Sequence, residues 1–126
     1  MPIDEQYLHS DITDKILTCV HQVFDTLGSG FSEKLYENAL VLELKVVGLD
    51  VRQQYPIKVT YRNTVIGEFV ADLLVDEKVI VELKAVEKLL PLHDSQLINY
   101  LKTTGIRVGL LVNFGETRPI YKRKIV

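Results

Sequence analysis

Apolar residues recur at helical spacing in the first third of the chain. Residues 10–27 place them every three or four positions, which predicts a helix that Gly28 ends. Ser32 is a suitable N-cap for a second helix over residues 33–47, which Gly48 ends. The core face expected for this second helix consists of Leu35, Ala39, Leu42 and Val46.

From residue 51 onward the hydrophobic period changes to two, as expected for strands. Residues 51–61 and 64–75 predict a hairpin around a tight Arg-Asn turn, and Pro56 indicates an edge strand or a bulge. The remaining elements are expected to be a strand at residues 79–86, a helix from Pro91 to Gly105, and strands at residues 107–114 and 118–126.

The order of elements is therefore α-α-β-β-β-α-β-β. It predicts an α/β fold in which a central mixed β-sheet is flanked by helices, and a single domain over residues 1–126. A helix joins the third and fourth strands, so we expect these two strands to be parallel, with a right-handed crossover.

The composition is that of an ordinary globular protein. The chain has 126 residues, of which 47% are hydrophobic and 25% charged, and a formal net charge of −2. This charge gives no sign of a tail for binding nucleic acid or membrane. The single cysteine, Cys19, lies in an apolar helical stretch, where we expect a buried and inert thiol. We expect a cytoplasmic protein, because the N-terminus lacks the apolar core of a signal peptide and no apolar run approaches the ~20 residues of a membrane span.

Three charged residues interrupt the core-like strands. Asp72 lies inside one apolar run, and Glu82 and Lys84 lie inside the next, two apart and therefore on one face of the strand. Pairing across the intervening turn would bring Asp72 close to both. Two carboxylates beside one ammonium in a low-dielectric setting are costly unless a divalent cation compensates them, and carboxylates suit Mg²⁺ or Mn²⁺. The alternative is a partly exposed salt bridge, which contributes only about 0–1 kcal/mol.

Two further polar groups carry candidate chemistry. Glu33 and Glu37 lie at i, i+4 on the second helix, where the alternative is a solvated acidic face near a helix N-terminus. His93, Gln96 and Tyr100 share one stripe of the third helix, where the alternative is a half-buried polar edge.

Together these motifs resemble a known family. The segment GFSEKLY fits G-x-x-E-x-x-Y through Gly30, Glu33 and Tyr36, and the segments ADLLV, VIVELKAV, QLINYLK and GLLVNFG follow it. The chain resembles the GxxExxY protein family, a branch of the PD-(D/E)XK nuclease superfamily. The segment QLINYLK is similar to the Q-x-x-x-Y motif of the RecB-like and Cas4-like branch. The chain departs from the pattern at one position, because Ala71 replaces the proline in the superfamily name.

The resemblance implies a role for each candidate residue. Asp72, Glu82 and the backbone carbonyl of Leu83 would hold Mg²⁺ or Mn²⁺. Glu33 would complete the shell of this metal, directly or through water, or help to hold a second ion. Lys84 would orient the attacking water or stabilise charge on the phosphate. The catalytic set would also contain Gln96 and Tyr100, contacting DNA or bracing the acidic cluster.

The function that these features indicate is a metal-dependent nuclease acting on DNA. Two alternatives stay open: a binding module that keeps the nuclease fold without cleavage, and a structural subunit with no role on nucleic acid. A basic cluster near the C-terminus is a candidate contact for phosphates, and the edge strand at residues 51–61 offers a surface for a homodimer. The basic cluster consists of Arg118, Lys122, Arg123 and Lys124.

Overall fold

The computed structural model describes residues 5–126. Its helices are a short 3-10 turn η1 (Glu5–Tyr7), α1 (Ser10–Leu27), α2 (Glu33–Val46) and α3 (Pro91–Thr104). Its strands are β1 (Val51–Tyr61), β2 (Thr64–Val75), β3 (Val79–Lys84), β4 (Val108–Asn113) and β5 (Ile120–Ile125). The predicted order of elements is confirmed.

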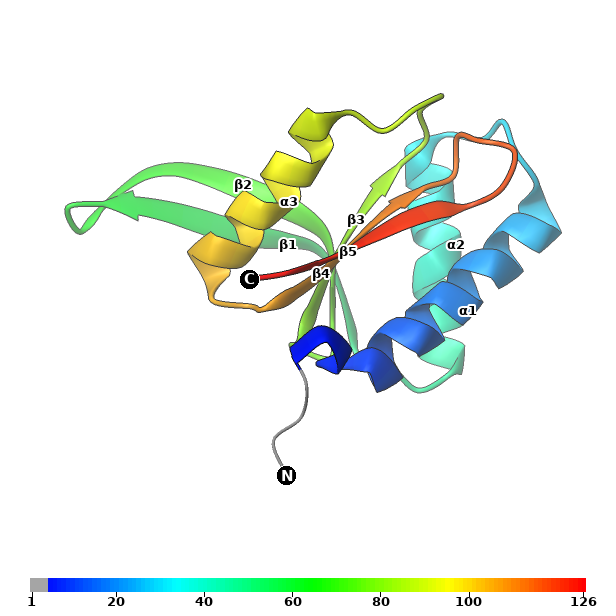
Figure 1. The fold of residues 1–126 in the computed structure, drawn as a ribbon, viewed down its shortest axis with the longest axis horizontal. Coiled ribbons are helices and arrows are strands. Elements are labelled where there is room, and N and C mark those ends of the chain that lie inside the picture. Colours follow the sequence, from blue (N-terminus) through cyan, green and yellow to red (C-terminus); the bar gives the residue numbers. More distant parts are fainter. Residues whose placement is uncertain (1–4) are drawn as a thin grey trace.

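The five strands form one mixed sheet in the order β1-β2-β3-β4-β5. β3 and β4 are parallel, as predicted from the helix between them, and the other neighbours are antiparallel. α1 and α2 lie on one face of the sheet and α3 lies on the other (Figure 1). The predicted α/β fold with a helix-flanked mixed sheet is therefore confirmed.

The alternation of β3 divides the core between these two faces. Val81 and Leu83 pack with α1 and α2, whereas Ile80 packs with α3. On β4, a Cβ added at Gly109 would lie 2.8 Å from a methyl group of Leu97, so the glycine lets α3 approach the sheet closely. α3 is thereby held over the end of β3 that carries Glu82 and Lys84.

The core face predicted for α2 was wrong. Leu42 and Val46 are exposed, and the buried side chains belong to the neighbouring stripe. That stripe consists of Tyr36, Glu37, Leu40, Val41 and Leu44. α2 is apolar over a wide arc, so apolar spacing alone did not select its buried side. The other helix predictions are confirmed: Ser32 caps α2 by accepting the Leu35 amide hydrogen at 3.3 Å, and Cys19 on α1 is buried.

The β1–β2 hairpin reaches beyond the sheet as an arm, defined here as residues 61–70, all of them exposed. Figure 1 shows this end of the hairpin projecting away from the helices and the other strands. Arg62 and Asn63 both have positive φ, which fits the predicted tight turn, and β1 is an edge strand as Pro56 indicated.

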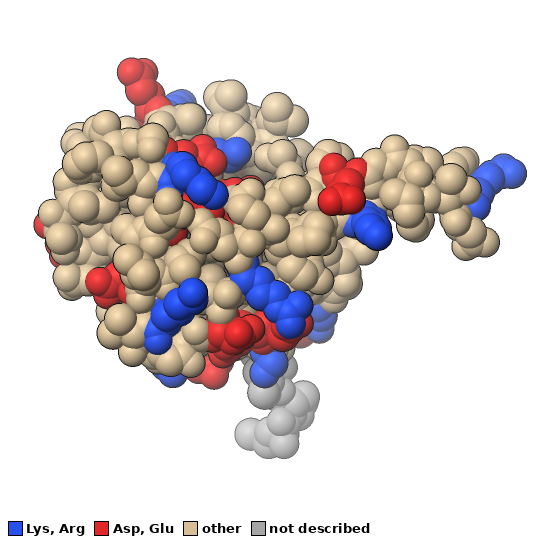
Figure 2. Space-filling view, turned by 180° about the vertical axis from the view of Figure 1, so that it is seen from behind, with Lys and Arg blue, Asp and Glu red and all other residues tan. Residues whose placement is uncertain are grey.

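Most of the C-terminal basic cluster already has partners within the chain. Lys122 and Lys124 contact Asp94 on α3 at 3.1 and 2.8 Å, and the Arg123 guanidinium donates to the backbone carbonyl oxygens of Gln6 and Leu8. On the face drawn in Figure 2, cations are interspersed with carboxylates and form no continuous basic patch. These lysines and this arginine therefore tie the edge strand β5 to its neighbours. Within residues 5–126, no helix has the length and apolar character needed to cross a membrane.

Candidate active site

β2 and β3 separate at the charged residues. Their ladder contains the pairs Val75 with Val79, Leu74 with Ile80, and Leu73 with Val81, and the next position would place Asp72 opposite Glu82. There the backbone pairing stops. We call the position between Asp72 and Glu82 the strand fork.

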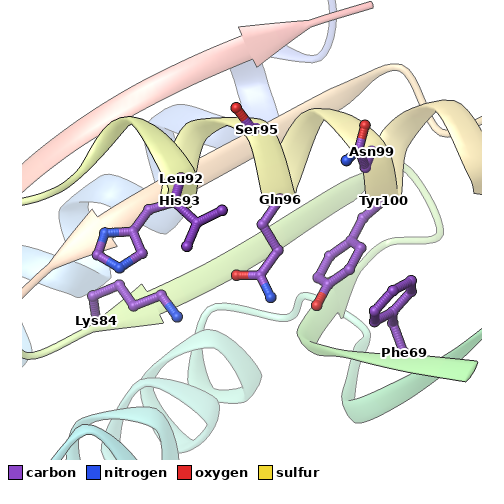
Figure 3. A pocket seen from close by; sticks show the side chains of 8 residues that line it. All are labelled: Phe69, Lys84, Leu92, His93, Ser95, Gln96, Asn99 and Tyr100. Atoms are coloured by element: carbon purple, nitrogen blue, oxygen red, sulfur yellow. The ribbon is translucent and has the colours of Figure 1, made fainter.

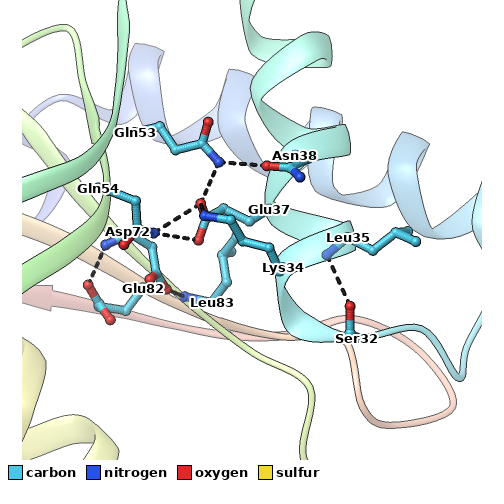
Figure 4. A network of polar contacts seen from close by, with 10 residues as sticks. All are labelled: Ser32, Lys34, Leu35, Glu37, Asn38, Gln53, Gln54, Asp72, Glu82 and Leu83. Carbon is cyan, nitrogen blue, oxygen red and sulfur yellow. Dashed lines mark hydrogen bonds and ion pairs between the residues drawn. The ribbon is translucent and has the colours of Figure 1, made fainter.

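Side chains take over the hydrogen bonding at the strand fork. The Asp72 backbone N–H donates to Oε1 of Glu82 at 2.9 Å, and the Leu83 backbone N–H donates to Oδ2 of Asp72 at 2.8 Å (Figure 4). Each carboxylate therefore holds the opposite strand and uses one of its oxygens to do so. The second oxygen of each carboxylate is left for a ligand.

The backbone carbonyl of Leu83 belongs to the same site. In a strand, the N–H and C=O of one residue project from the same edge. The Leu83 N–H points toward Asp72, so its carbonyl also lies on the β2 side, where no ladder partner follows. Two carboxylates and one carbonyl oxygen are thus directed to the strand fork.

Burial makes the negative charge at the strand fork costly. Glu82 is only 5% exposed. Burial, followed by the neighbouring Asp72 carboxylate, raises the pKa of Glu82 to about 8. Burial also raises the pKa of Asp72 to about 6, against the lowering effect of the hydrogen bond from the Leu83 amide. Burial is the largest cause of both shifts, and the lowering effect of Lys84 does not offset it.

Lys84 and Glu33 both lie within electrostatic range of the carboxylate pair. The charge of Lys84 lowers the pKa of both acids, although the ion pairs of residues 5–126 do not include Lys84. Glu33, in the first turn of α2, raises both. The structure therefore brings together Asp72, Glu82, Lys84 and the N-terminal end of α2.

Glu37 is also directed to this region, although the sequence favoured Glu33. It is buried at 2% exposure and raises the pKa of Asp72 more strongly than Glu33 does. Its carboxylate accepts hydrogen bonds from Lys34 at 2.9 Å, from Gln53, and from Gln54 at 3.0 Å (Figure 4). Gln54 has a positive φ of 56° and falls between two register pairs of the β1–β2 ladder. The distorted strand thus turns its amide toward α2.

The tyrosine of the G-x-x-E-x-x-Y motif holds α2 in position. The Tyr36 hydroxyl donates to the Gly28 carbonyl oxygen at 2.6 Å and accepts from the Phe31 amide at 3.3 Å. Its ring stacks on Phe114 at 4.5 Å with an interplanar angle of 3°. The motif therefore fixes the loop before α2 to the end of β4, and so sets where Glu33 lies.

α3 completes the site from the opposite face. His93, Gln96 and Tyr100 project from one side of this helix toward Lys84 on β3 and Phe69 on β2, and all five line one pocket (Figure 3). Burial raises the pKa of Tyr100, as do the Glu82 and Asp72 carboxylates, while a hydrogen bond from Gln96 opposes the shift. The stripe predicted on α3 is therefore adjacent to the carboxylate pair.

Comparison with known proteins identifies the family. The sequence model of the PD-(D/E)XK nuclease superfamily matches residues 10–124. The chain belongs to this superfamily. No curated protein matches the sequence.

Two solved structures share the PD-(D/E)XK fold of this chain. The crystal structure of SSO0001 has a TM-score of 0.59 at 18% identity, and covers 95% of this chain. The chain spans 60% of the length of SSO0001. The alkaline exonuclease LHK-Exo from Laribacter hongkongensis has a TM-score of 0.50 at 14% identity, over 84% of this chain and 75% of its own length. At these identities the likeness shows the fold alone.

The donor chemistry of this PD-(D/E)XK chain fits a hard divalent cation. Two buried carboxylates and a backbone carbonyl are oxygen ligands of the kind that Mg²⁺ and Mn²⁺ prefer. Among residues 5–126, no three His, Cys, Asp or Glu side chains are grouped closely enough to hold a metal by themselves. Asp72 and Glu82 are the two carboxylates that hydrogen-bond across the strand fork.

Sequence reasoning missed the residues that depend on long-range partners. Gln53 and Gln54 lie on an edge strand whose polar positions give no sign of their contact with α2. Phe69 was assigned only to a hairpin, yet its ring lies 5.5 Å from Tyr100. An aromatic ring at an exposed strand position was the one signal available for Phe69.

Proposed function

We propose that this PD-(D/E)XK protein is a metal-dependent nuclease that hydrolyses phosphodiester bonds in DNA. The observation that carries the proposal is the strand fork, where Asp72 and Glu82 interlock beside Lys84 in a region that the sheet otherwise buries. A scaffold gains nothing from two carboxylates there, because their burial raises both pKa values. The motifs favour the GxxExxY family within the superfamily and its RecB-like and Cas4-like branch.

Asp72, Glu82 and the Leu83 carbonyl would hold Mg²⁺ or Mn²⁺. Glu33 would add a ligand through water, since its side chain is only partly buried at the first turn of α2. The chemistry that such a cation supplies is polarisation of a phosphoryl oxygen and a lower pKa for a bound water. Glu37 holds β1 against α2 through Gln53 and Gln54 and keeps this end of the site rigid.

Lys84 would act on the phosphate from the α3 side of the strand fork. An ammonium held there favours the charge that builds on the phosphate oxygens in the transition state. The Tyr100 hydroxyl lies within electrostatic range of the Asp72 and Glu82 carboxylates and is hydrogen-bonded to Gln96. Gln96 and Tyr100 would support the two carboxylates of the strand fork and contact the DNA strand that enters along α3.

A cleavage assay tests the proposal. Labelled single- and double-stranded DNA would be incubated with the parent protein in Mg²⁺, in Mn²⁺ and in EDTA. We expect cleavage with either metal and none in EDTA. Asp72→Asn should abolish cleavage, because asparagine keeps an acceptor for the Leu83 amide but removes the charge. Asp25→Asn, on the exposed side of α1, is the matched control. Absence of metal-dependent cleavage from the parent protein on every substrate would leave the non-cleaving binding module as the better description.

A further inference from the structure

A pocket of about 400 Å³ opens beside Lys84, between α3 and the base of the β1–β2 arm. Its volume falls within the range of roughly 300–1,000 Å³ that is usual for small-ligand sites. Leu92 and His93 form one end of the pocket, Phe69 forms the other, and Gln96 lies between them (Figure 3). It shares Lys84, Gln96 and Tyr100 with the residues to which the proposed function assigns a role.

The lining has the chemistry of a nucleobase site. Phe69 and Leu92 are large apolar side chains that are 47% and 71% exposed, so their apolar surface is available to a ligand. An aromatic ring in such a position is a stacking platform for the flat face of a base. Among residues 5–126, Lys84 is the one lysine or arginine that lines the pocket, so the pocket does not have the chemistry of a track for several phosphates.

Polar groups in the pocket can read the edge of a base. Nδ1 of His93 accepts the Leu90 backbone N–H at 3.0 Å, so Nε2 carries the ring proton and is left to donate. The Gln96 amide offers both donors and an acceptor, of which its bond to the Tyr100 hydroxyl uses one. A few oriented polar groups within an apolar pocket are typical of a specific small-ligand site.

We propose that this pocket binds an unpaired nucleobase, so that the substrate of the proposed nuclease is single-stranded DNA or an unpaired DNA end. A base paired and stacked in a duplex cannot enter a pocket of this kind. A nucleotide whose phosphate lies at Lys84 can place its base against Phe69, because the two residues line the same cavity. The inference rests on the proposed function for its ligand class but concerns different side chains, those of Phe69, Leu92 and His93.

Binding to two labelled oligonucleotides of equal length tests the pocket. One is oligothymidylate and the other is its abasic counterpart, which has the same phosphates but no bases. Binding is measured by fluorescence anisotropy in EDTA, where no hydrolysis occurs. We expect the parent protein to bind oligothymidylate more tightly than the abasic strand. Phe69→Ala should reduce affinity for oligothymidylate on the order of tenfold and leave affinity for the abasic strand unchanged.

Two further variants separate stacking from damage to the fold. Phe69→Tyr keeps an aromatic face and should retain the preference for bases. Ile66→Ala removes an exposed apolar side chain from the arm outside the pocket and should change neither affinity. Equal binding of the two strands by the parent, undetectable binding of both, or a base preference that survives in Phe69→Ala would each overturn the proposal.

The outcome is independent of the cleavage test. A base preference that depends on Phe69, in a protein that cuts no DNA, would support the pocket and refute the nuclease. Metal-dependent cleavage without any base preference would support the nuclease and refute the pocket.

Discussion

The backbone of β3 is hydrogen-bonded in different ways on its two sides, the one that faces β4 and the one that faces β2. On the β4 side, each residue from Val79 to Lys84 has a register partner, and the strand that faces it is buried throughout. On the β2 side the ladder ends after Leu73 and Val81, and carboxylates satisfy the backbone amides instead. One strand of six residues therefore serves as a core strand along one edge and as a polar site along the other.

The difference teaches why the charges lie where they do. A regular ladder would pair the Leu83 amide with the backbone of β2 and leave no room between the strands. Because β2 and β3 separate directly after the Leu73–Val81 pair, the Asp72 and Glu82 carboxylates are held by rigid strand backbone. Strands fix the positions of these groups far better than a loop would. The penalty for this arrangement is visible in the raised pKa values of both acids.

Removing the charge of Glu82, on the side of β3 that faces β2, should have the largest effect on cleavage. Glu82→Gln keeps an oxygen for the Asp72 amide, so we expect the fold to survive. Cleavage should fall by more than about 10³-fold, because even a residue outside the first shell of a metal costs roughly 10–100-fold. Affinity for Mn²⁺, measured by calorimetry, should fall with it. Glu87→Gln, an exposed carboxylate beyond the end of β3, is the control and should behave as the parent.

Lys84→Ala separates catalysis from metal binding on the same side. This variant should retain Mn²⁺, since it removes a cation and no ligand. Cleavage should still fall by about 10²–10³, the usual cost of losing one group that stabilises transition-state charge. Lys88→Ala is the matched control, because Lys88 is exposed four residues further on. If Lys84→Ala cuts DNA as fast as the parent, the lysine has no catalytic role and the assignment of this strand is wrong.

A substitution on the β4 side should act on stability alone. Leu110 is fully buried opposite Val81, so Leu110→Ala should lower the free energy of unfolding by about 2–5 kcal/mol. Urea denaturation measures this loss, and Val46→Ala, at an exposed position of α2, should change it little. Affinity for Mn²⁺, measured where the protein is folded, should stay the same. A parallel loss of metal affinity would show that the two sides of β3 are not independent.

The pH dependence of stability should differ with and without metal. In EDTA, the pKa of Glu82 in the folded protein is about 8, above the ordinary glutamate value of 4.5, so between these values the folded protein binds more protons than the unfolded chain. Stability should therefore be highest at the acid end of this window and fall as the pH rises through it. The pKa of Asp72 is raised to about 6, so Asp72 should change stability in the same direction. Among the neighbouring charges, Lys84 lowers these pKa values, whereas Glu33 and Glu37 raise them.

Mg²⁺ should reverse this trend, because it binds the ionised carboxylates and stabilises the folded state by mass action. Unfolding in urea would be followed at about pH 5 and about pH 8.5, in EDTA and in Mg²⁺. Glu82→Gln should flatten the EDTA profile. Stability in EDTA that rises across the window would contradict the assigned pKa shifts.

The sequence predicted the parts of the molecule that depend on local pattern. The order of elements, the Arg62-Asn63 turn, the parallel β3–β4 pair and the burial of Cys19 all follow from spacing and composition, and the structure confirms them. The resemblance singled out Asp72, Glu82 and Lys84, and the structure brings these residues together. Their roles in catalysis stay predictions.

The parts that escaped prediction depend on contacts between distant segments. The sequence favoured Glu33 over Glu37 and left a solvated acidic face open for both, yet Glu37 is buried and Gln53 and Gln54 from another element satisfy its carboxylate. Leu42 is apolar, so hydrophobic spacing assigned it to the core, yet it is exposed on a side of α2 that no element of residues 5–126 covers. Likewise, no local pattern indicates where β2 and β3 separate.

The smallest expected effect tests this corrected face of α2. Leu42 is 67% exposed, so Leu42→Ala should change the free energy of unfolding by no more than about 0.5 kcal/mol. Leu40 is fully buried two positions earlier, and Leu40→Ala should cost about 2–5 kcal/mol in the same urea titration. The pair holds the chemistry of the substitution constant and changes only the side of the helix. Comparable losses in the two variants would mean that a partner covers Leu42 in solution, and a larger loss for Leu42→Ala would restore the face that spacing alone had indicated.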